Sequence, residues 1–522
     1  MPLLNRAHEK ILSRKLKADD LPYVTSIKFK ELTKVKESIV GKPILCSGCK
    51  AALTNPASVK VDPKVGHHFI CEFCGTLNVV DPKDLPSGSW TDLDYIIETK
   101  PEPKDITKLK ITGDNIASVI DISGSMSDGK LEAVKRSLVE TVRDLKVNSP
   151  SSHFSLITFE SSVRLLSHKG KEVLKLSGDT LHSKKDIIKR FQKADLDFVP
   201  ISDTADRWID MINRMMPMDM TALGPALLGG VTLLGRVGTG GRLILLTDGM
   251  ANQGLGNLET PTSSGKNFYE EMGDLCLNHN IIVEVVGVQS HEGASELGLD
   301  VLGRLADKTG GDIFFVTREE LKDAFEKMRS VDYLAKNVTV NVIAPKKRLK
   351  LRSVSGVSVP KAAGPIEVGA VTKDREIFYE METLDDLKEE KVPVQTQIMY
   401  KDKEGNTHLR IINETLKTTK DEKEYNKKYN LNLTTTYNVQ KAGESYYKSD
   451  VKAAKTQLKA YQTKIKNLAA AGPMPAAAEA VIAQLDDEME EIDEKERKVE
   501  KYKGKKSYRA KFAQDMKRRM SE

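Results

Sequence analysis

The stretch Asn115-Ile116-Ala117-Ser118-Val119-Ile120-Asp121-Ile122-Ser123-Gly124-Ser125-Met126 decides the fold of the central part of the chain. Its first six residues are mostly apolar and predict a short buried strand, and apolar residues recur at helical spacing over residues 130–145. The Asp-x-Ser-x-Ser pattern therefore lies on a strand-to-helix loop. In a parallel α/β sheet, such a loop opens at the carboxyl end of the strand, where these folds bind ligands.

The Asp-x-Ser-x-Ser pattern offers one carboxylate and two hydroxyls, which are hard oxygen ligands suited to Mg²⁺. Thr221, expected at the start of a helix, and Asp248, which ends the apolar run 243–247, supply two more oxygens. An alternative is that the first Asp and Ser only cap the next helix. Agreement between three separate segments favours a metal site, with Mn²⁺ as a substitute for Mg²⁺. The candidate magnesium ligands are Asp121, Ser123, Ser125, Thr221 and Asp248.

In this order, the Asp-x-Ser-x-Ser, Thr and Thr-Asp-Gly segments resemble the metal-ion-dependent adhesion site of a von Willebrand factor A domain. The resemblance implies that Ser123, Ser125 and Thr221 contact the metal directly. It implies that Asp121 and Asp248 act mostly through water, and that an Asp or Glu of a partner protein completes the coordination shell.

The segments that follow this pattern predict the sheet around it. Strands are expected at residues 154–159, 242–247 and 281–288, with helical stretches between them. Strands that alternate with helices indicate a parallel, doubly wound sheet, here over residues 107–330.

Four of the five cysteines form two Cys-x-x-Cys pairs separated by 21 residues, which predicts a zinc ribbon at residues 40–80. Four thiolates can enclose one tetrahedral Zn²⁺ and leave no open position for catalysis, so this zinc is expected to be structural. His67 and His68 are alternative ligands, but neighbouring strand residues point to opposite faces, which favours a solvated pair. The candidate zinc ligands are Cys46, Cys49, Cys71 and Cys74.

The remaining segments predict further domains. Residues 81–106, rich in proline and charge, are expected to form a connector. Residues 331–440 alternate between apolar and polar positions and predict a β-sandwich, of which residues 1–39 are a candidate part. Residues 445–522 predict a C-terminal helical hairpin with coiled-coil packing and a basic tail. The hairpin either packs on the protein itself or forms a partner-binding arm. The tail is interpreted as a solvated segment, with an anionic membrane or an acidic filament as alternative partners.

Length and composition set outer limits on the function. A chain of 522 residues should hold several domains, because single cores usually stop growing near about 250–300 residues. The formal charge of +6 is small for this length, so no nucleic-acid partner is expected. The sequence shows neither a signal-peptide core nor an apolar run of about 20 residues. The protein is therefore expected to be cytoplasmic, and at most peripheral to a membrane or the cytoskeleton.

The order zinc ribbon, A domain, β-sandwich and helices resembles the inner-coat subunits of COPII vesicles. This resemblance covers residues 40–416 and implies a role in vesicle transport, with a small GTPase, a related coat subunit, cargo tails and a membrane surface as partners. Local matches are Asn55-Pro56, Asn267-Phe268-Tyr269-Glu270-Glu271, Thr309-Gly310-Gly311, residues 394–400 and Leu409-Arg410-Ile411.

Two departures from the coat family are visible in the sequence. That family usually ends in a gelsolin-like domain, and no stretch after Met474 matches one. Its trunk domains generally have degraded metal sites, whereas the ligand pattern here is intact.

The sequence predicts a non-enzymatic, protein-binding scaffold. Its nine histidines show no catalytic grouping, and there is no phosphate-binding Gly-Lys-Ser/Thr loop. The alternative is a metal-dependent interaction protein of a cytoskeletal assembly, microtubule or ciliary, or of another large assembly. A third hypothesis is a regulatory subunit of an enzyme complex.

Overall fold

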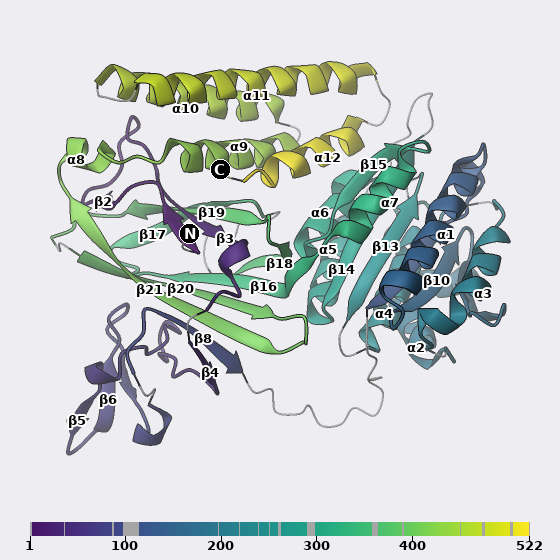
Figure 1. The fold of residues 1–522 in the computed structure, drawn as a ribbon, viewed down its shortest axis with the longest axis horizontal. Coiled ribbons are helices and arrows are strands. Elements are labelled where there is room, and N and C mark those ends of the chain that lie inside the picture. Colours follow the sequence, from purple (N-terminus) through teal and green to yellow (C-terminus); the bar gives the residue numbers. More distant parts are fainter. Residues whose placement is uncertain are drawn as a thin grey trace. The chain divides into compact units, whose positions relative to one another are not determined.

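The computed structural model describes residues 3–35, 37–85, 88–97, 114–196, 198–218, 220–237, 240–249, 251–258, 263–289, 298–357, 364–388, 391–448, 450–471, 475–501 and 505–520. The chain divides into two compact units, whose elements are labelled in Figure 1. The first unit comprises Met1–Glu102, Tyr333–Ile492 and Asp515–Glu522, and the second comprises Pro103–Asp332 and Asp493–Gln514. Residues 98–113, which include the end of the predicted connector and the start of the predicted A domain, lie outside the described residues.

The second unit is built on a seven-stranded sheet of order β12-β11-β10-β9-β13-β14-β15. The strands from β10 to β15 in this order run parallel to their neighbours, whereas β11 and β12 form an antiparallel edge that the sequence analysis missed. The predicted doubly wound sheet is confirmed. Its strands are β9 (Asn115–Asp121), β10 (His153–Phe159), β11 (Val163–Leu166), β12 (Glu172–Leu176), β13 (Gly241–Thr247), β14 (Ile281–Gln289) and β15 (Ile313–Thr317).

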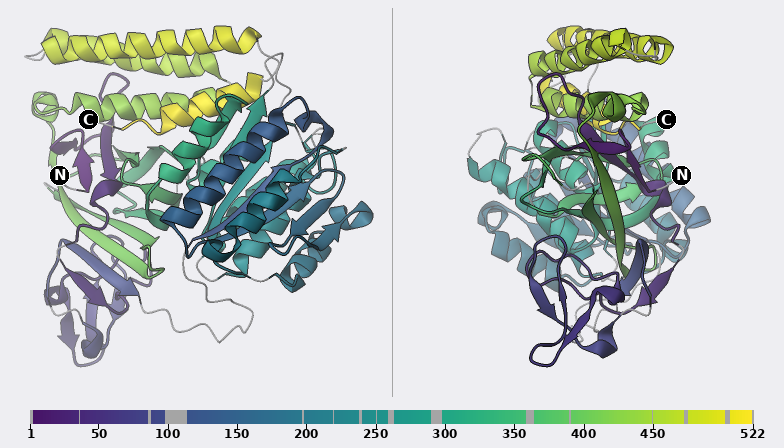
Figure 2. Two further views of the ribbon diagram at one scale, coloured as in Figure 1. Left: turned by 45° about the vertical axis from the view of Figure 1, so that its right-hand side comes forward. Right: turned by 90° about the vertical axis from the view of Figure 1, so that its left-hand side faces the viewer.

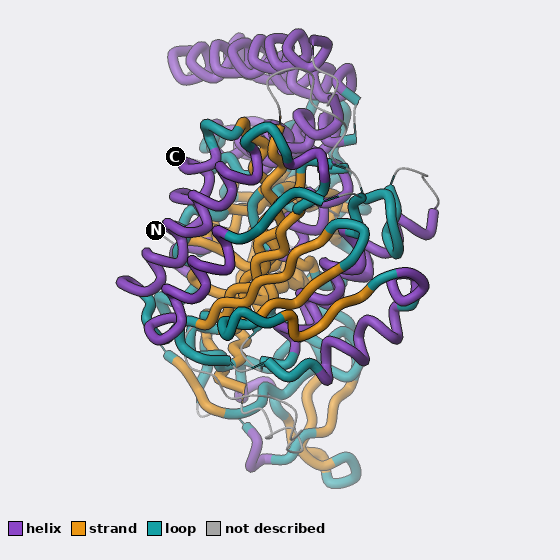
Figure 3. Tube along the Cα trace, turned by 90° about the vertical axis from the view of Figure 1, so that its right-hand side faces the viewer, coloured by secondary structure: helices purple, strands orange, loops and turns teal. Residues whose placement is uncertain are grey.

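Helices cover both faces of this sheet, as Figure 3 shows. Successive residues of β9 alternate between the two cores, so that Val119 packs with one set of helices and Ile120 with the other. Helices therefore shield both faces of the sheet from water, and for this reason the central strands are almost continuously apolar. The helices on one face are α1 (Lys130–Asn148), α3 (Ile201–Asn213) and α7 (Leu321–Ser330), and those on the other are α2 (Lys184–Lys193), α4 (Leu223–Gly235), α5 (Ser263–Asn278) and α6 (Leu299–Thr309).

The first unit contains the predicted β-sandwich, which is confirmed. One sheet has the order β1-β3-β19-β17, and the other has the order β18-β16-β20-β21-β8-β4 with β2 paired to β21. Apolar side chains of both sheets form one core. The strands are β1 (Leu4–Arg6), β2 (Lys10–Leu12), β3 (Tyr23–Lys28), β4 (Ser38–Val40), β8 (Asp92–Ile97), β16 (Tyr333–Ile343), β17 (Leu349–Ser355), β18 (Ile366–Thr372), β19 (Glu376–Thr383), β20 (Lys391–Lys401) and β21 (Thr407–Thr419).

Two segments differ from the sequence-based expectation. Part of the expected connector, residues 92–97, forms β8 and pairs with β21 and β4. Part of the expected sandwich, residues 431–440, belongs instead to helix α9 (Leu431–Tyr447). Thr434, Thr435 and Thr436 favour a strand locally. The helix forms nevertheless, because the Asn430 side chain caps it at Leu433 N and the threonines are largely buried.

The four cysteines lie beside a small three-stranded sheet of β5 (Lys60–Asp62), β6 (Gly66–Ile70) and β7 (Leu77–Val79). Cys46 and Cys49 precede this sheet in the chain, and Cys71 and Cys74 lie in the turn between β6 and β7. Two glutamines of β20 hold this segment to the sandwich. Gln395 is buried, receives a hydrogen bond from Ala52 N at 2.7 Å and donates one to Ala52 O at 3.0 Å. Gln397 donates to Lys50 O at 2.9 Å. Both side chains lie on the same face of β20 because strand side chains alternate.

The C-terminal helices of the first unit lie on the opposite side of the sandwich from β5, β6 and β7 (Figures 1 and 2). The short helix α8 (Glu422–Asn426) precedes α9, and the long helices α10 (Val451–Ala471) and α11 (Pro475–Lys501) follow it, with α12 (Lys505–Lys517) last. The end of α11 and most of α12 belong to the second unit. Gln462 of α10 donates to Asp486 of α11 at 2.8 Å, so these two helices pack together. No helix of the described residues is both long and apolar enough to cross a membrane.

The described part of the basic tail is folded and paired rather than solvated. In the first unit, Arg519 binds Glu488 at 3.2 Å and Glu491 at 3.1 Å, and Lys517 is buried over the ring of Tyr447. In the second unit, Arg509 forms an ion pair with Glu496 of α11. The acidic stretch of α11 therefore neutralises much of the basic end, which sequence reasoning treated as a separate segment.

Candidate metal centres

The predicted magnesium ligands lie where neighbouring parallel strands end. Asp121 is the last residue of β9, and Asp248 directly follows Thr247, the last residue of β13. These strands are adjacent and in register, with Ile120 beside Leu246. Their carboxyl ends therefore bring the two loops together at one edge of the sheet.

Three oxygen atoms from these loops form a contiguous chain. Ser123 Oγ lies 2.9 Å from Ser125 Oγ, and Ser125 Oγ donates to Asp248 Oδ1 at 2.5 Å. Adjacent ligands of an octahedral Mg²⁺ lie about 3.0 Å apart when each is about 2.1 Å from the metal. The two serine hydroxyls share a hydrogen bond here, and their separation is also compatible with two neighbouring ligands of one Mg²⁺.

The Asp121 side chain joins the Asp-x-Ser-x-Ser loop to the end of β13. It is fully buried, accepting from Ser123 N at 2.8 Å through Oδ1 and from Thr247 Oγ1 at 2.7 Å through Oδ2. Burial and, to a smaller extent, the nearby charge of Asp248 raise the pKa of Asp121, and these hydrogen bonds oppose the rise, so that the pKa is about 6. Asp121 is therefore a structural support of the loop as well as a candidate ligand.

Lys130 supplies a cation that the sequence analysis did not anticipate. Its Nζ atom donates to Asp248 Oδ2 at 2.5 Å and to the carbonyl of Ser125 at 2.9 Å. The Asp248 side chain is fully buried and that of Lys130 is 13% exposed. Lysine is unfavourable at the first residue of a helix, because the helix dipole places positive charge there. That mismatch is the sequence signal that an acidic partner lies nearby.

Thr221 lies in the loop before α4 and is buried. Its backbone N donates to Asn252 Oδ1 at 3.0 Å, and Ala222 N donates to the carbonyl of Glu160, just beyond β10, at 2.8 Å. This loop is therefore held at the carboxyl end of β10, next to β9 in the sheet. Asn252, like Thr247, supports the candidate ligands without being one, and sequence reasoning did not identify either role.

The four cysteines form a second, closed centre in the first unit. Their sulfur atoms all lie within 4.8 Å of one another, and the group contains neither His67 nor His68. Cys46 and Cys74 sulfurs are 3.6 Å apart, and Cys49 and Cys71 sulfurs are 3.5 Å apart, so no disulfide joins them. Sulfurs bound about 2.3 Å from a tetrahedral Zn²⁺ lie about 3.8 Å apart. The observed cluster therefore fits a structural zinc.

The protonation of the cysteines agrees with a cation at this centre. Burial raises the pKa of the Cys46 thiol, but hydrogen bonds from the backbone of Cys49 and the side chain of Asn78 outweigh it and lower the pKa to about 6. Burial raises the pKa of Cys49 and of Cys71. Burial acts on Cys74 as well, but hydrogen bonds with Thr76 outweigh it and lower the pKa of that thiol. Cys46 and Cys74 are thus more readily thiolates, whereas Cys49 and Cys71 need a bound cation to release their protons.

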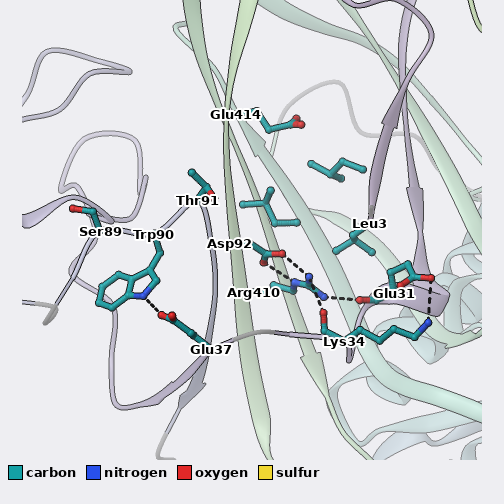
Figure 4. A pocket seen from close by; sticks show the side chains of 12 residues that line it. Leu3, Glu31, Lys34, Glu37, Ser89, Trp90, Thr91, Asp92, Arg410 and Glu414 are labelled. Carbon is teal, nitrogen blue, oxygen red and sulfur yellow. Dashed lines mark hydrogen bonds and ion pairs between the residues drawn. The ribbon is translucent and has the colours of Figure 1, made fainter. Parts of the chain in front are cut away.

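A pocket of about 470 Å³ in the first unit was not foreseen from the sequence. Figure 4 shows Arg410 directed at Asp92 and the Trp90 ring directed at Glu37. Arg410 binds both carboxylate oxygens of Asp92, at 2.8 and 2.6 Å, and the carbonyls of Glu31 and Leu32 at 2.6 Å each. Its guanidinium is satisfied by the protein itself, which favours a structural role for this pocket.

Residues 117–329 match the family model of the Sec23/Sec24 trunk domain. The second unit is therefore a von Willebrand A-like trunk of this type. Together with the four-cysteine cluster, the sandwich and the C-terminal helices, it defines a Sec24-like multidomain fold.

Two individual proteins illustrate the likeness. The crystal structure of the human COPII-coat protein Sec24c superposes with a TM-score of 0.68 at 15% identity, covering 98% of this chain and 74% of that one, and shows the shared fold. The Dictyostelium discoideum protein named circularly permutated Ras protein 1 is 23% identical over 495 residues, which cover 88% of this chain. The chain spans 57% of the length of that relative.

Proposed function

We propose that the chain is a non-enzymatic binding scaffold whose trunk site holds Mg²⁺ and uses it to bind an acidic side chain of a protein partner. The observation that carries this proposal is that oxygens of Ser123, Ser125 and Asp248, which come from two separate loops, meet at the carboxyl ends of neighbouring strands. Ser123, Ser125 and Thr221 would hold the metal, with Asp121 and Asp248 supporting it through water. A bound Mg²⁺ would supply an electrophile for a partner's carboxylate.

The chain's own residues explain why such a site would remain available to a partner. The direct ligands are neutral hydroxyls, so they would leave much of the metal charge uncompensated. Ser125 and the neighbouring Gly124 are exposed, whereas Asp121 and Ser123 are buried. The open side of the site is therefore the side on which an external carboxylate would arrive.

The four-cysteine cluster has a different proposed role. Cys46, Cys49, Cys71 and Cys74 would bind a structural Zn²⁺, because four thiolates complete a tetrahedral shell and leave no position for a substrate or partner. This zinc would hold the small sheet in the shape that Gln395 and Gln397 bind.

Ser125→Ala is the sharpest test of the magnesium site. We expect Mg²⁺ to raise the unfolding temperature of the wild type in EDTA-treated samples, and the variant to need at least about ten-fold more Mg²⁺ for the same shift, because one direct ligand is gone. Ser127→Ala is the matched control, since its hydroxyl in the same loop binds only the Gly124 carbonyl, at 2.7 Å. Equal Mg²⁺ responses of all three proteins would contradict the proposal.

Asp121→Ala is a weaker test of the magnesium site than the sequence alone indicates. Loss of this buried carboxylate would leave Ser123 N and Thr247 Oγ1 without their acceptor. Each unsatisfied donor costs about 1–3 kcal/mol, so lost binding could not be separated from local unfolding.

A coat-like role at a membrane, with a small GTPase as partner, is a second candidate function. The Sec24-like order of domains and the Ras name of the Dictyostelium relative favour it. Recruitment of the purified chain to anionic liposomes by a membrane-bound Ras-type GTPase in the GTP state, and not in the GDP state, would support this candidate. Recruitment that ignores the nucleotide would contradict it. The cytoskeletal alternative has less support, because the described basic residues at the end of the chain are paired internally.

A further inference from the structure

Exposed apolar side chains of the second unit concentrate at one place. Among its described residues, four large apolar side chains are strongly exposed: Val147, Met216, Met218 and Met220. Three of the four are therefore methionines within a span of five residues. We call Met216, Met218 and Met220 the methionine rim; their exposed fractions are 69%, 47% and 50%.

The methionine rim borders the oxygen site directly. Met218 N donates to the carbonyl of Ile122 at 2.6 Å, and Met218 forms a parallel bridge with Ser123. Met220 immediately precedes Thr221. The same loop that presents one candidate ligand thus runs along the Asp-x-Ser-x-Ser loop and carries its methionines to solvent.

The exposure is not a consequence of poor packing in this part of the chain. Met215 and Ile212 of the preceding segment are buried in the core beside α1. The side chains of Met216, Met218 and Met220, in contrast, are exposed. Apolar side chains gathered on a surface usually mark a contact with another molecule. Methionine suits that role because its flexible, polarisable side chain adapts to different apolar surfaces.

We propose that the partner segment carries an Asp or Glu flanked by large apolar side chains, which pack on the methionine rim while the carboxylate approaches the oxygen site. This inference rests on the proposed magnesium-dependent function and names the chemistry of its partner. Polar and apolar groups adjoin here as such a segment requires: the exposed Ser125 belongs to the Asp-x-Ser-x-Ser loop, and the rim belongs to the loop that bridges to Ser123 of the same pattern. Arg164, whose Nη1 lies 3.6 Å from Met218 Sδ, borders the rim, but its charge is paired with Glu160 at 2.8 Å and Glu172 at 3.3 Å, so it adds no free cation for the partner.

Three synthetic nonapeptides test this inference on the full-length chain. Their centres read Leu-Asp-Leu, Ser-Asp-Ser and Leu-Asn-Leu, and all other positions are the same. Affinities are measured by fluorescence anisotropy in Mg²⁺ and in EDTA. Carbon-13 labelled methionine methyl groups report which methionines the peptides contact, with assignments from single Met→Leu variants.

We expect the Leu-Asp-Leu peptide to bind in Mg²⁺ about ten-fold more tightly than Ser-Asp-Ser, because part of its leucine surface is buried on the rim. Binding should shift the methyl signals of Met216, Met218 and Met220. The triple variant Met216→Ser, Met218→Ser, Met220→Ser should lose the preference for leucine and keep the weaker binding of Ser-Asp-Ser. Val147→Ser, an equally exposed position near the far end of α1, about 25 Å along the helix from Lys130, should change nothing.

The outcomes separate the two proposals. Mg²⁺-dependent binding of Ser-Asp-Ser and Leu-Asp-Leu with equal affinity would overturn the role of the rim and leave the magnesium site standing. Failure of both Asp peptides to bind in Mg²⁺ with no response of the unfolding temperature to the metal would overturn both. Binding of Leu-Asn-Leu as tight as Leu-Asp-Leu would show that the carboxylate does not matter, which also contradicts the inference.

Discussion

The two candidate metal centres of this chain differ in how completely the protein encloses them. The zinc centre takes all four ligands from its own residues, and two of them, Cys46 and Cys71, are buried. The oxygen site has an exposed candidate ligand, Ser125, and it offers neutral hydroxyls where the zinc centre offers cysteine sulfurs. A closed ligand set serves the fold, because nothing outside can reach the metal, whereas an incomplete set is useful only when a partner completes it.

The centres also differ in how charge is balanced before a metal binds. The hydrogen bonds of the four sulfurs join them to neutral groups, namely one another, Thr76 and Asn78. The oxygen site has a resident cation, because Lys130 binds Asp248. The zinc centre should therefore depend on its metal to fold, and the oxygen site should fold without one.

Cys71→Ser should have the largest effect of the substitutions considered. Structural zinc contributes on the order of 10 kcal/mol to the folding of a small zinc domain, so the variant should lose its zinc and the small sheet should unfold. Zinc content by elemental analysis and tryptic cleavage at Lys60 and Lys64 measure the two losses. Cys276→Ala, a buried thiol in α5, should keep one zinc per chain. Retention of zinc by Cys71→Ser would show that the centre is not a closed four-thiolate set.

Lys130→Met tests whether an internal cation balances the charge of the oxygen site when no metal is bound. Without metal, the variant leaves the buried carboxylate of Asp248 unpaired, and breaking a buried pair in this way costs about 3–5 kcal/mol. Saturating Mg²⁺ should restore most of that stability, and the Mg²⁺ affinity should rise about ten-fold because no internal cation opposes the metal. Urea unfolding with and without Mg²⁺ measures both effects.

Lys135→Met is the control for that experiment. Lys135 lies on the same helix and pairs at 2.7 Å with Glu132, whose side chain is 65% exposed. An exposed partner contributes at most about 1 kcal/mol, so this variant should remain close to the wild type and respond to Mg²⁺ as the wild type does. Destabilisation of Lys130→Met that Mg²⁺ does not relieve would mean that Asp248 is no part of a metal site.

The residues of both candidate centres could be picked out from the sequence because each set depends on local spacing or on a general rule of topology. Two Cys-x-x-Cys pairs define the zinc centre without knowledge of the fold. Asp121 and Asp248 are 127 positions apart, yet both follow buried parallel strands, and the carboxyl ends of such strands meet at one edge of a sheet.

Features that depend on distant partners could not be predicted in the same way. Residues 92–97 become strand β8 only because β21, more than 300 residues later, pairs with them. Thr434, Thr435 and Thr436 become helical through burial and through the Asn430 cap, against their local preference. The pairing of the basic tail with α11 likewise depends on how the helices pack. Tertiary contacts decided each of these cases.

Gln395→Ala tests whether the zinc centre keeps its metal without its contact with the β-sandwich. Its expected effect is the smallest of the substitutions considered. The substitution leaves both Ala52 N and Ala52 O without the partner that now holds the small sheet to the sandwich. We expect a loss of about 1–3 kcal/mol in unfolding free energy and faster hydrogen exchange at the Ala52 amide. Zinc content should stay at one per chain, because the four sulfurs do not depend on the glutamine. Met399→Ala, an exposed position on the same face of β20, should leave stability and exchange unchanged. Loss of zinc in Gln395→Ala alone would show that the centre requires the sandwich for its shape, and that its closed ligand set is not sufficient by itself.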